Sequence, residues 1–424
     1  MVFSRKMKKK LQHKVASNIF SLTFAKGIDV LIPLLLIPFL VHKLGVESYG
    51  VFATCLVTLN FLMRFTDFGI NITTSKNIAI TNNTKAALDI LVNSLQAKLF
   101  LLAPALIIYY LISLSYSETY FDVSLCLSIA LICDTFSPLN YYQGLQRLRY
   151  YAFVCLIWRW ISALSVLLFV RSKDDLLLYC LLHSLSYFGI LVNLFIPLVS
   201  KHRKDLTFKW RFKKTKEVLK DGWQVFSFSL ISSLFVPIIT NYIAITSNAG
   251  MVTIFNVTQR IFSSAYRFFE PINTAVFPYL SNLHSSDIRA YVNRSKLILY
   301  FFLMASFCFL ILLLVLHEPI LHLFIGVTNS ASIWIYFISG ITLVSNVMNL
   351  YISHILIIIG KAKDIKKIVV LAFSILFIAL CISYITKANV IYIVIINTIP
   401  SYVTFLLCGK IYYSEMYKVK IQQK

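Results

Sequence analysis

The sequence predicts an all-α polytopic membrane protein with twelve transmembrane helices in two pseudo-symmetric six-helix halves. Three observations support this class: a strongly apolar composition, twelve long apolar segments, and a partial internal repeat. Of the 424 residues, 58% are hydrophobic and 13% are charged, and the mean hydropathy is +0.77. A soluble domain is about half apolar and about a quarter charged. The composition therefore excludes an ordinary soluble protein.

The apolar segments have the length that a bilayer requires, because a spanning helix needs ~20 predominantly apolar residues. No small-residue cleavage site follows the basic N-terminus, so we expect a first span there and not a signal peptide. The connections are too short for a soluble catalytic domain. The expected spans are 15–41, 48–68, 87–113, 123–142, 150–170, 176–199, 222–246, 251–279, 297–317, 331–359, 367–386 and 388–408.

The basic residues predict the orientation, since Lys and Arg concentrate in short cytoplasmic connections. With both termini placed in the cytoplasm, thirty basic residues fall on that side and four on the other. This topology accounts for most of the net charge of +23. We therefore expect attraction to anionic membrane lipids and no nucleic acid partner, because no recognition motif accompanies the charge.

The internal repeat is clearest in two short polar stretches of similar sequence. MRFTDFGIN at 63–71 returns as YRFFEPIN at 266–273, with the arginine and the acidic residue of each stretch 203 positions apart. Two parallel six-helix halves form a common transporter architecture, in which their interface opens to either side. The expected division is an N-terminal half at 1–200, a basic cytoplasmic linker at 201–221 and a C-terminal half at 222–424.

Charged residues within the spans are the candidate site. A charge at the helix centre costs ~2.5–3.5 kcal/mol on insertion scales, so such residues tend to face the bundle interior or a water-filled cavity. The candidates for a cationic, substrate-binding cavity are Lys26, Arg64, Lys98, Arg159, Arg260 and Arg267. The candidates for coupling or charge pairing are Asp29, Asp67, Asp134 and Glu270.

Two interpretations of these charges remain open. Lys26, Arg64 and Arg267 each precede an acidic residue by three positions, so each could form a structural pair on its own helix. The other three basic residues have no acidic partner at that spacing, although Asp134 could serve one of them. The excess of six basic over four acidic residues favours an anionic ligand.

Three further stretches carry a family resemblance: LIPLLLIPFLVHKLGVESYGVFA at 31–53, DFG at 67–69 and YYQGLQRLRYYAF at 141–153. They resemble the bacterial O-antigen and polysaccharide flippases, a family of the MOP superfamily that also contains the MATE exporters. The second half departs from the family pattern, because SNAGMVTIFNV at 247–257 stands where a glycine–tyrosine pair is common.

The resemblance implies a MATE-like fold and a flippase for undecaprenyl-pyrophosphate-linked O-antigen or related repeat units. Such a protein works by alternating access in the bacterial inner membrane, with coupling to H⁺ or Na⁺ and with a polysaccharide polymerase or chain-length regulator as partner. Arginine suits this cargo because its guanidinium binds phosphate oxygens bidentately. Polar side chains for the sugars lie in the second half: Thr240, Asn241, Asn256, Gln259 and Asn273.

Two other functions remain open: a MATE-like cation-coupled exporter of small molecules and a membrane glycan polymerase. The exporter would favour acidic cavity groups, and the polymerase would need a large outer loop or a catalytic carboxylate pair. The eight cysteines and eight histidines show no metal-binding spacing. We therefore expect no metal and no cofactor. Because the outer loops are short and no carboxylate pair has catalytic spacing, we also expect no enzyme activity.

Overall fold

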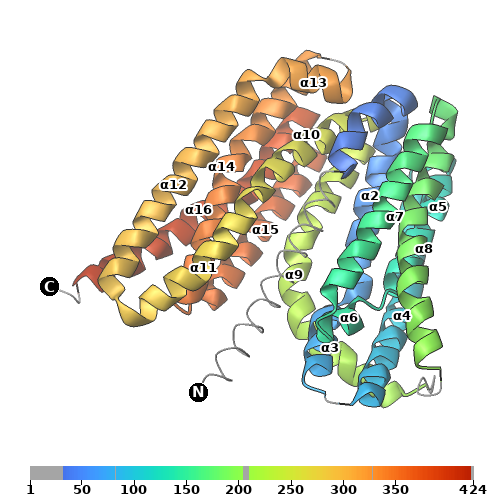
Figure 1. The fold of residues 1–424 in the computed structure, drawn as a ribbon. Helices are drawn as coiled ribbons and strands as arrows, with labels where there is room; N and C mark the ends of the chain where they lie inside the picture. Colours follow the sequence, from blue (N-terminus) through green and yellow to red (C-terminus); the bar gives the residue numbers. More distant parts are fainter. Residues whose placement is uncertain (1–31, 82, 204–209, 327, 422–424) are drawn as a thin grey trace. The chain divides into compact units, whose positions relative to one another are not determined.

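The computed structural model describes residues 32–81, 83–203, 210–326 and 328–421, and these are helical with short connections and no β-strand. The contacts divide the chain into two compact units, residues 1–237 and 238–424. Figure 1 shows the long helices of both units, which confirm the all-helical class.

The first unit is built around α5 and α8, which pack on each other and on α2, α4 and α7. Within this unit a helical stretch, Ile32–Leu44, precedes α2. Its helices are α2 (Val46–Asp67), α3 (Ile70–Ala79), α4 (Thr84–Leu114), α5 (Glu118–Thr135), α6 (Leu139–Gly144), α7 (Leu148–Phe169), the 3-10 turn η1 (Lys173–Asp175), α8 (Leu176–Lys201) and the first part of α9 (Phe212–Thr246).

The second unit is built around α14, which packs against α10, α11, α12 and α16. In the most apolar stretch of α14 half of the residues are buried, whereas about a fifth of the residues are buried in the corresponding stretches of α12 and α16. The helices of this unit are α10 (Ala249–Arg267), α11 (Phe269–Ser286), α12 (Ile288–Val315), α13 (His317–Ile325), α14 (Ser330–Ile358), α15 (Ala362–Ile385) and α16 (Val390–Ile421).

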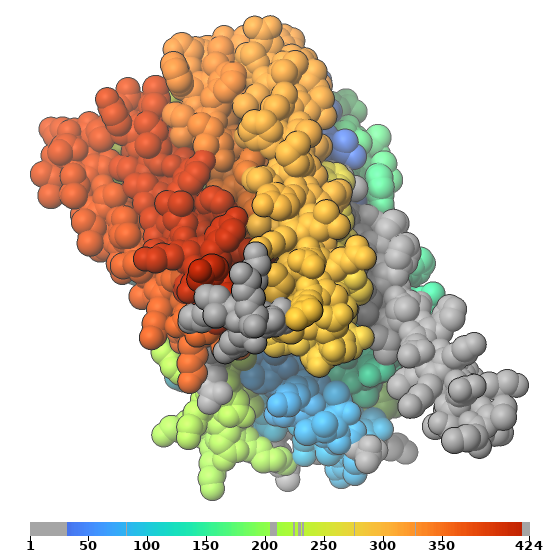
Figure 2. All heavy atoms as spheres, turned by 90° about the vertical axis from the view of Figure 1, so that its left-hand side faces the viewer, coloured from blue at the N-terminus to red at the C-terminus, as the bar shows by residue number. Residues whose placement is uncertain are grey.

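Nine helices in the described ranges are long and apolar enough to cross a membrane, and two shorter apolar helices, Ile32–Leu44 and Ser233–Thr246, accompany them. Figure 2 shows α12 and α16 on the surface of the second unit, as yellow-orange and red spheres. Large apolar side chains of α12 are exposed, including Tyr300, Met304 and Phe307. Exposure of this kind suits a surface that faces lipid, and the chain is a multi-pass membrane protein.

Two of the expected spans are interrupted. The segment 251–279 forms α10 and α11 with a break at Phe268, because Pro271 has no N–H to donate to the carbonyl of Arg267. The segment 123–142 forms α5 and α6, and Pro138 lies at the start of α6. Hydropathy follows the apolar length of a span but does not detect an interruption within it.

A third interruption separates α2 from α3 at the DFG stretch. Phe68 and Gly69 both have left-handed backbone conformations, with φ of 47° and 73°. The ring of Phe68 stacks on Phe226 of α9 at 4.4 Å between centroids. A side chain at Gly69 would meet the carbonyl oxygen of Gly222 at 2.8 Å, so the two glycines allow the backbones to touch. The break is thus held by the first part of α9.

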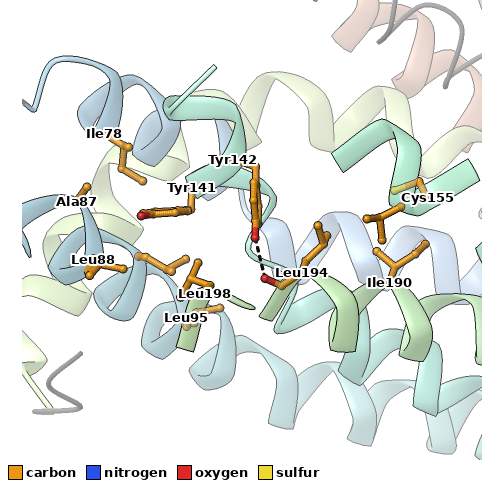
Figure 3. Packing of buried hydrophobic residues seen from close by; sticks show 12 residues of the cluster. Ile78, Ala87, Leu88, Leu95, Tyr141, Tyr142, Cys155, Ile190, Leu194 and Leu198 are labelled. Atoms are coloured by element: carbon orange, nitrogen blue, oxygen red, sulfur yellow. Dashed lines mark hydrogen bonds between the residues drawn. The ribbon is translucent and has the colours of Figure 1, made fainter. Parts of the chain in front are cut away.

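The aromatic–Gln–Gly stretch forms α6, which packs against α3. A Cβ at Gly144 would lie 2.6 Å from the Cβ of Ile78, so this glycine permits the close approach. Figure 3 shows the apolar cluster around α6, in which the hydroxyl of Tyr142 donates to the carbonyl of Leu194 at 2.8 Å. Asn140 is buried nearby and donates to hydroxyl groups of α3 and α4. The stretch therefore has a packing role.

Candidate functional site

The candidate site of the first unit begins at the break between α2 and α3. Asp67 is the last residue of α2, and its Oδ1 accepts a hydrogen bond from the backbone N–H of Asn71 at 3.2 Å. The first N–H groups of a helix lack partners within the helix, so an acidic oxygen there is stabilising. Asp67 therefore caps α3 across the interruption.

Lys98 of α4 completes this arrangement. Lys98 is 2% exposed. Its Nζ donates a hydrogen bond to Oδ1 of Asn71 at 2.9 Å and lies 3.7 Å from Oδ1 of Asp67. A buried ammonium group needs compensating partners of this kind. The sequence paired Asp67 with Arg64 as one interpretation, whereas the structure pairs it with Lys98.

Asp134 of α5 lies near the same group. The charges close enough to act on its half-buried carboxylate are those of Lys98, Asp67, Arg64 and Arg159. Arg159 is half-buried on α7, and Arg64 is exposed. Within the described part of the chain, Arg64 makes no ion pair. The structure thus pairs two of the ten predicted residues, Lys98 and Asp67, and places Asp134 within electrostatic range of this pair, Arg64 and Arg159.

The predicted residues of the second unit are arranged differently. Arg260 is half-buried on α10, Arg267 is the exposed last residue of that helix, and Glu270 is exposed in the first turn of α11. Among the residues that the structure covers, Arg267 and Glu270 form no ion pair within 4.0 Å. The pairing predicted from their spacing is therefore absent in the described structure.

Asn273 and His354 form a polar contact that the charge analysis did not single out. Asn273 is 1% exposed, and its amide donates to the carbonyl of Leu350 at 3.1 Å and lies 2.7 Å from Nδ1 of His354. We predicted Asn273 as a partner for sugar hydroxyls, but its amide nitrogen is used within the protein. It connects α11 to α14.

Asn71 is the residue of the first-unit site that sequence reasoning missed. The internal repeat could have identified it, because Asn71 and Asn273 are the last residues of the two matched stretches. In each unit this asparagine joins the helix after the break to another helix, α4 or α14. A search restricted to charged residues overlooks such a group.

Two predicted residues, Lys26 and Asp29, lie outside the described residues. Across the ranges that the structure describes, no three His, Cys, Asp or Glu side chains come close enough to hold a metal ion. The geometry that remains is a set of positive and negative side chains at a helix interruption, which can bind an ion or an ionic ligand.

Comparisons with known proteins agree with this architecture. The family model described as "Polysaccharide biosynthesis protein" matches residues 15–284. A "Putative O-antigen transporter" of Escherichia coli is 23% identical over 366 residues, which cover 84% of this chain and 86% of that protein.

Two solved structures share the fold. The structure titled "Lipid II flippase MurJ, inward closed conformation" has a TM-score of 0.74 and 14% identity, covering 94% of this chain and 89% of that one. An inward-facing multidrug resistance MATE transporter of the MOP superfamily has a TM-score of 0.71 and 16% identity, covering 96% and 100%. These likenesses confirm the MATE-like fold that the sequence predicted, although the count of twelve spans is not established by them. Since the family model matches well over half of the chain, the chain belongs to the polysaccharide biosynthesis protein family.

Proposed function

We propose that this protein is a flippase that moves undecaprenyl-pyrophosphate-linked O-antigen or related repeat units from the cytoplasmic to the periplasmic face of the inner membrane. The observation that carries the proposal is the charge cluster of the first unit, formed by the three basic residues Arg64, Lys98 and Arg159 and the two acidic residues Asp67 and Asp134. The family, and a relative named as an O-antigen transporter, support transport of a saccharide over catalysis.

The chemistry of the cargo explains why such a cluster is useful. A polyprenyl tail stays in the bilayer, whereas a pyrophosphate cannot cross hydrocarbon without compensating charge. Lys98 is held by Asp67 and Asn71, while Arg64 is exposed and makes no ion pair among the described residues. In this proposal Arg64 and Arg159 bind phosphate oxygens, and Lys98 adds positive potential from within the protein.

The proposed mechanism is alternating access between two halves of the chain. The sequence divides them at the basic segment 201–221, whereas the contacts divide the chain at residue 237, within α9. The repeated Arg-Phe-x-acid stretches support the duplication, because a helix interruption lies within four residues of the arginine in both. In this proposal the candidates for coupling to H⁺ or Na⁺ are Asp134, which lies among the cations, and Glu270.

The proposed setting is the bacterial inner membrane with both termini in the cytoplasm. The excess of basic residues in the connections assigned to that side supports the orientation. A polymerase or chain-length regulator would receive the repeat unit on the periplasmic face, because the flipped unit must be consumed there.

Deletion of the gene tests the function directly. We expect complete undecaprenyl-pyrophosphate repeat units to accumulate on the cytoplasmic face of the inner membrane, measured by labelling the lipid-linked sugars in oriented vesicles. Unpolymerised single repeats on the outer face would instead show a polymerase. Unchanged pools on both faces would contradict both functions and favour a small-molecule exporter.

The second unit provides a prediction at YRFFEPIN. Arg267→Ala is expected to abolish complementation of the deletion strain while the protein is still made in normal amounts, because the exposed guanidinium is lost without disturbing a buried contact. The measurement is polysaccharide export together with protein level by immunoblot. Wild-type export by Arg267→Ala would contradict a role in transport.

Glu270→Gln separates two roles for the neighbouring carboxylate. If Glu270 carries the coupled ion, flipping by this variant persists but no longer responds when an ionophore collapses the H⁺ or Na⁺ gradient. If Glu270 only orients Arg267, flipping falls and the remaining activity still follows the gradient. Glu318→Gln, which removes an exposed carboxylate in the first turn of α13, is the matched control for the loss of a negative charge.

A further inference from the structure

The first unit contains a second cationic site outside the charge cluster. A cavity of about 790 Å³ lies between the start of α7 and the end of α8. Its basic lining residues are Arg147, Arg149, Lys201 and His202. The two arginines and Lys201 carry three positive charges at neutral pH, and these charges around one cavity create a positive potential that favours an anion.

The walls of the cavity are aromatic and fixed. Tyr142 is 6% exposed, and its hydroxyl donates to the carbonyl of Leu194 (Figure 3). The hydroxyl of Tyr150 donates to the carbonyl of Asn193 at 3.1 Å. Both bonds attach the aromatic wall to α8, so the cavity does not depend on a ligand for its shape.

The turn before α7 positions both arginines of the cavity. Gln146 adopts a left-handed conformation with φ of 56°, and the backbone N–H of Arg147 donates to the carbonyl of Tyr142 at 2.8 Å. This reversal puts Arg147 and Arg149 at the N-terminal end of α7, where the helix dipole also favours negative charge.

An exposed apolar stripe leads away from the cavity along α7. Phe153 lines the cavity and is 61% exposed, and Ile157, Trp160 and Leu164 follow at helical spacing with 37%, 46% and 53% exposed. At 1.5 Å per residue the stripe from Phe153 to Leu164 extends about 16 Å, close to half of the ~30 Å hydrocarbon core. One chain of a lipid in a single leaflet has that reach.

We propose that this cavity binds the phosphate-bearing headgroup of a membrane lipid whose hydrocarbon chain lies along the exposed stripe of α7. Basic pockets between transmembrane helices are suited to anionic headgroups. The arginines supply bidentate contacts to phosphate oxygens, and Lys201 supplies a point charge from α8. The site is separate from the charge cluster, and the proposal does not depend on the flippase function.

Two lipids present this chemistry, an anionic phospholipid of the bulk membrane and a polyprenyl pyrophosphate. Native mass spectrometry of the full-length protein in detergent distinguishes them by titration with phosphatidylglycerol, undecaprenyl pyrophosphate, phosphatidylcholine or inorganic pyrophosphate. We expect saturable binding of one or both anionic lipids with at least tenfold preference over phosphatidylcholine. The lipid with the tighter first binding step identifies the source.

The test variant is Arg147→Gln/Arg149→Gln, with Lys201→Gln as an independent change on the opposite wall. Both are expected to weaken binding of the first anionic lipid by about tenfold or more, because each removes charge-assisted hydrogen bonds to the phosphate; tenfold corresponds to about 1.4 kcal/mol. The matched control is Lys213→Gln/Lys214→Gln, which removes two exposed charges of α9 that do not line the cavity. Circular dichroism and the melting temperature of each variant establish that it is folded.

Several outcomes would overturn the proposal. Equal lipid binding by the cavity variants and the wild type would exclude the cavity as the site. An equal loss in the Lys213→Gln/Lys214→Gln control would show attraction by net charge alone. Inorganic pyrophosphate that binds as tightly as either lipid would show a site for a free anion, with no contribution from the apolar stripe.

Discussion

Lys98→Gln is expected to lower the stability of the protein strongly and to abolish polysaccharide export. The side chain of Lys98 is 3% exposed and contacts Asp67, and its charge also acts on Asp134. Without the ammonium group Asp67 loses its ion-pair partner, and breaking a buried ion pair costs about 3–5 kcal/mol. The measurements are the melting temperature in detergent, by intrinsic fluorescence, and export in the deletion strain.

Two further variants separate stability from transport. Lys98→Gln/Asp67→Asn removes both charges, so we expect it to recover much of the melting temperature while export remains lost. Lys76→Gln removes an exposed charge of α3 and should behave as the wild type. Full export by the double variant would show that Lys98 and Asp67 serve only to stabilise each other.

Gly69→Ala is expected to destabilise the first unit by about 3 kcal/mol or more. Two costs add together: a left-handed conformation costs a residue with a Cβ about 1–2 kcal/mol, and the new Cβ would lie 2.8 Å from both the carbonyl oxygen of Gly222 and the Cβ of Val225. Overpacking of this kind costs typically about 1–3 kcal/mol. The loss is measured as a fall in the melting temperature and in the yield of monodisperse protein.

Two other glycines serve as controls for the separate costs. Gly360 also has a positive φ, of 77°, but nothing lies within 4 Å of a Cβ placed there, so Gly360→Ala carries the conformational cost alone. Gly409→Ala has neither cost and should be close to neutral. Equal melting temperatures for Gly69→Ala and Gly360→Ala would contradict the contact between the break and α9.

The fold class could be predicted because apolar length and the distribution of Lys and Arg are properties of the sequence alone. The interruptions could be predicted less well. Pro138 and Pro271 are visible, yet proline is also tolerated inside helices here, as at Pro104 in α4 and Pro197 in α8. A proline shows where a helix can break, and the packing around it decides whether the helix does break.

The charged residues of the candidate site could be listed from the sequence, but their pairings could not, and their role in binding stays a prediction. The cost of a charge in the bilayer identifies Lys98 and Asp134 as residues that need partners. Their partners come from other helices, and helical spacing gives no information about contacts between helices. Spacing suggested Arg64 for Asp67, but the geometry of the break brings Lys98 and Asn71 to that carboxylate.

The bracing of the Phe68–Gly69 interruption has a consequence for motion. Phe68 stacks on Phe226, and Gly69 and Gly222 approach so closely that neither position has room for a side chain. Rotation of α3 relative to α2 would therefore require the first part of α9 to separate from both. We therefore expect α2, α3 and the first part of α9 to move as one rigid body, which would keep Asp67 of α2 and Asn71 of α3 in a fixed geometry toward Lys98 of α4.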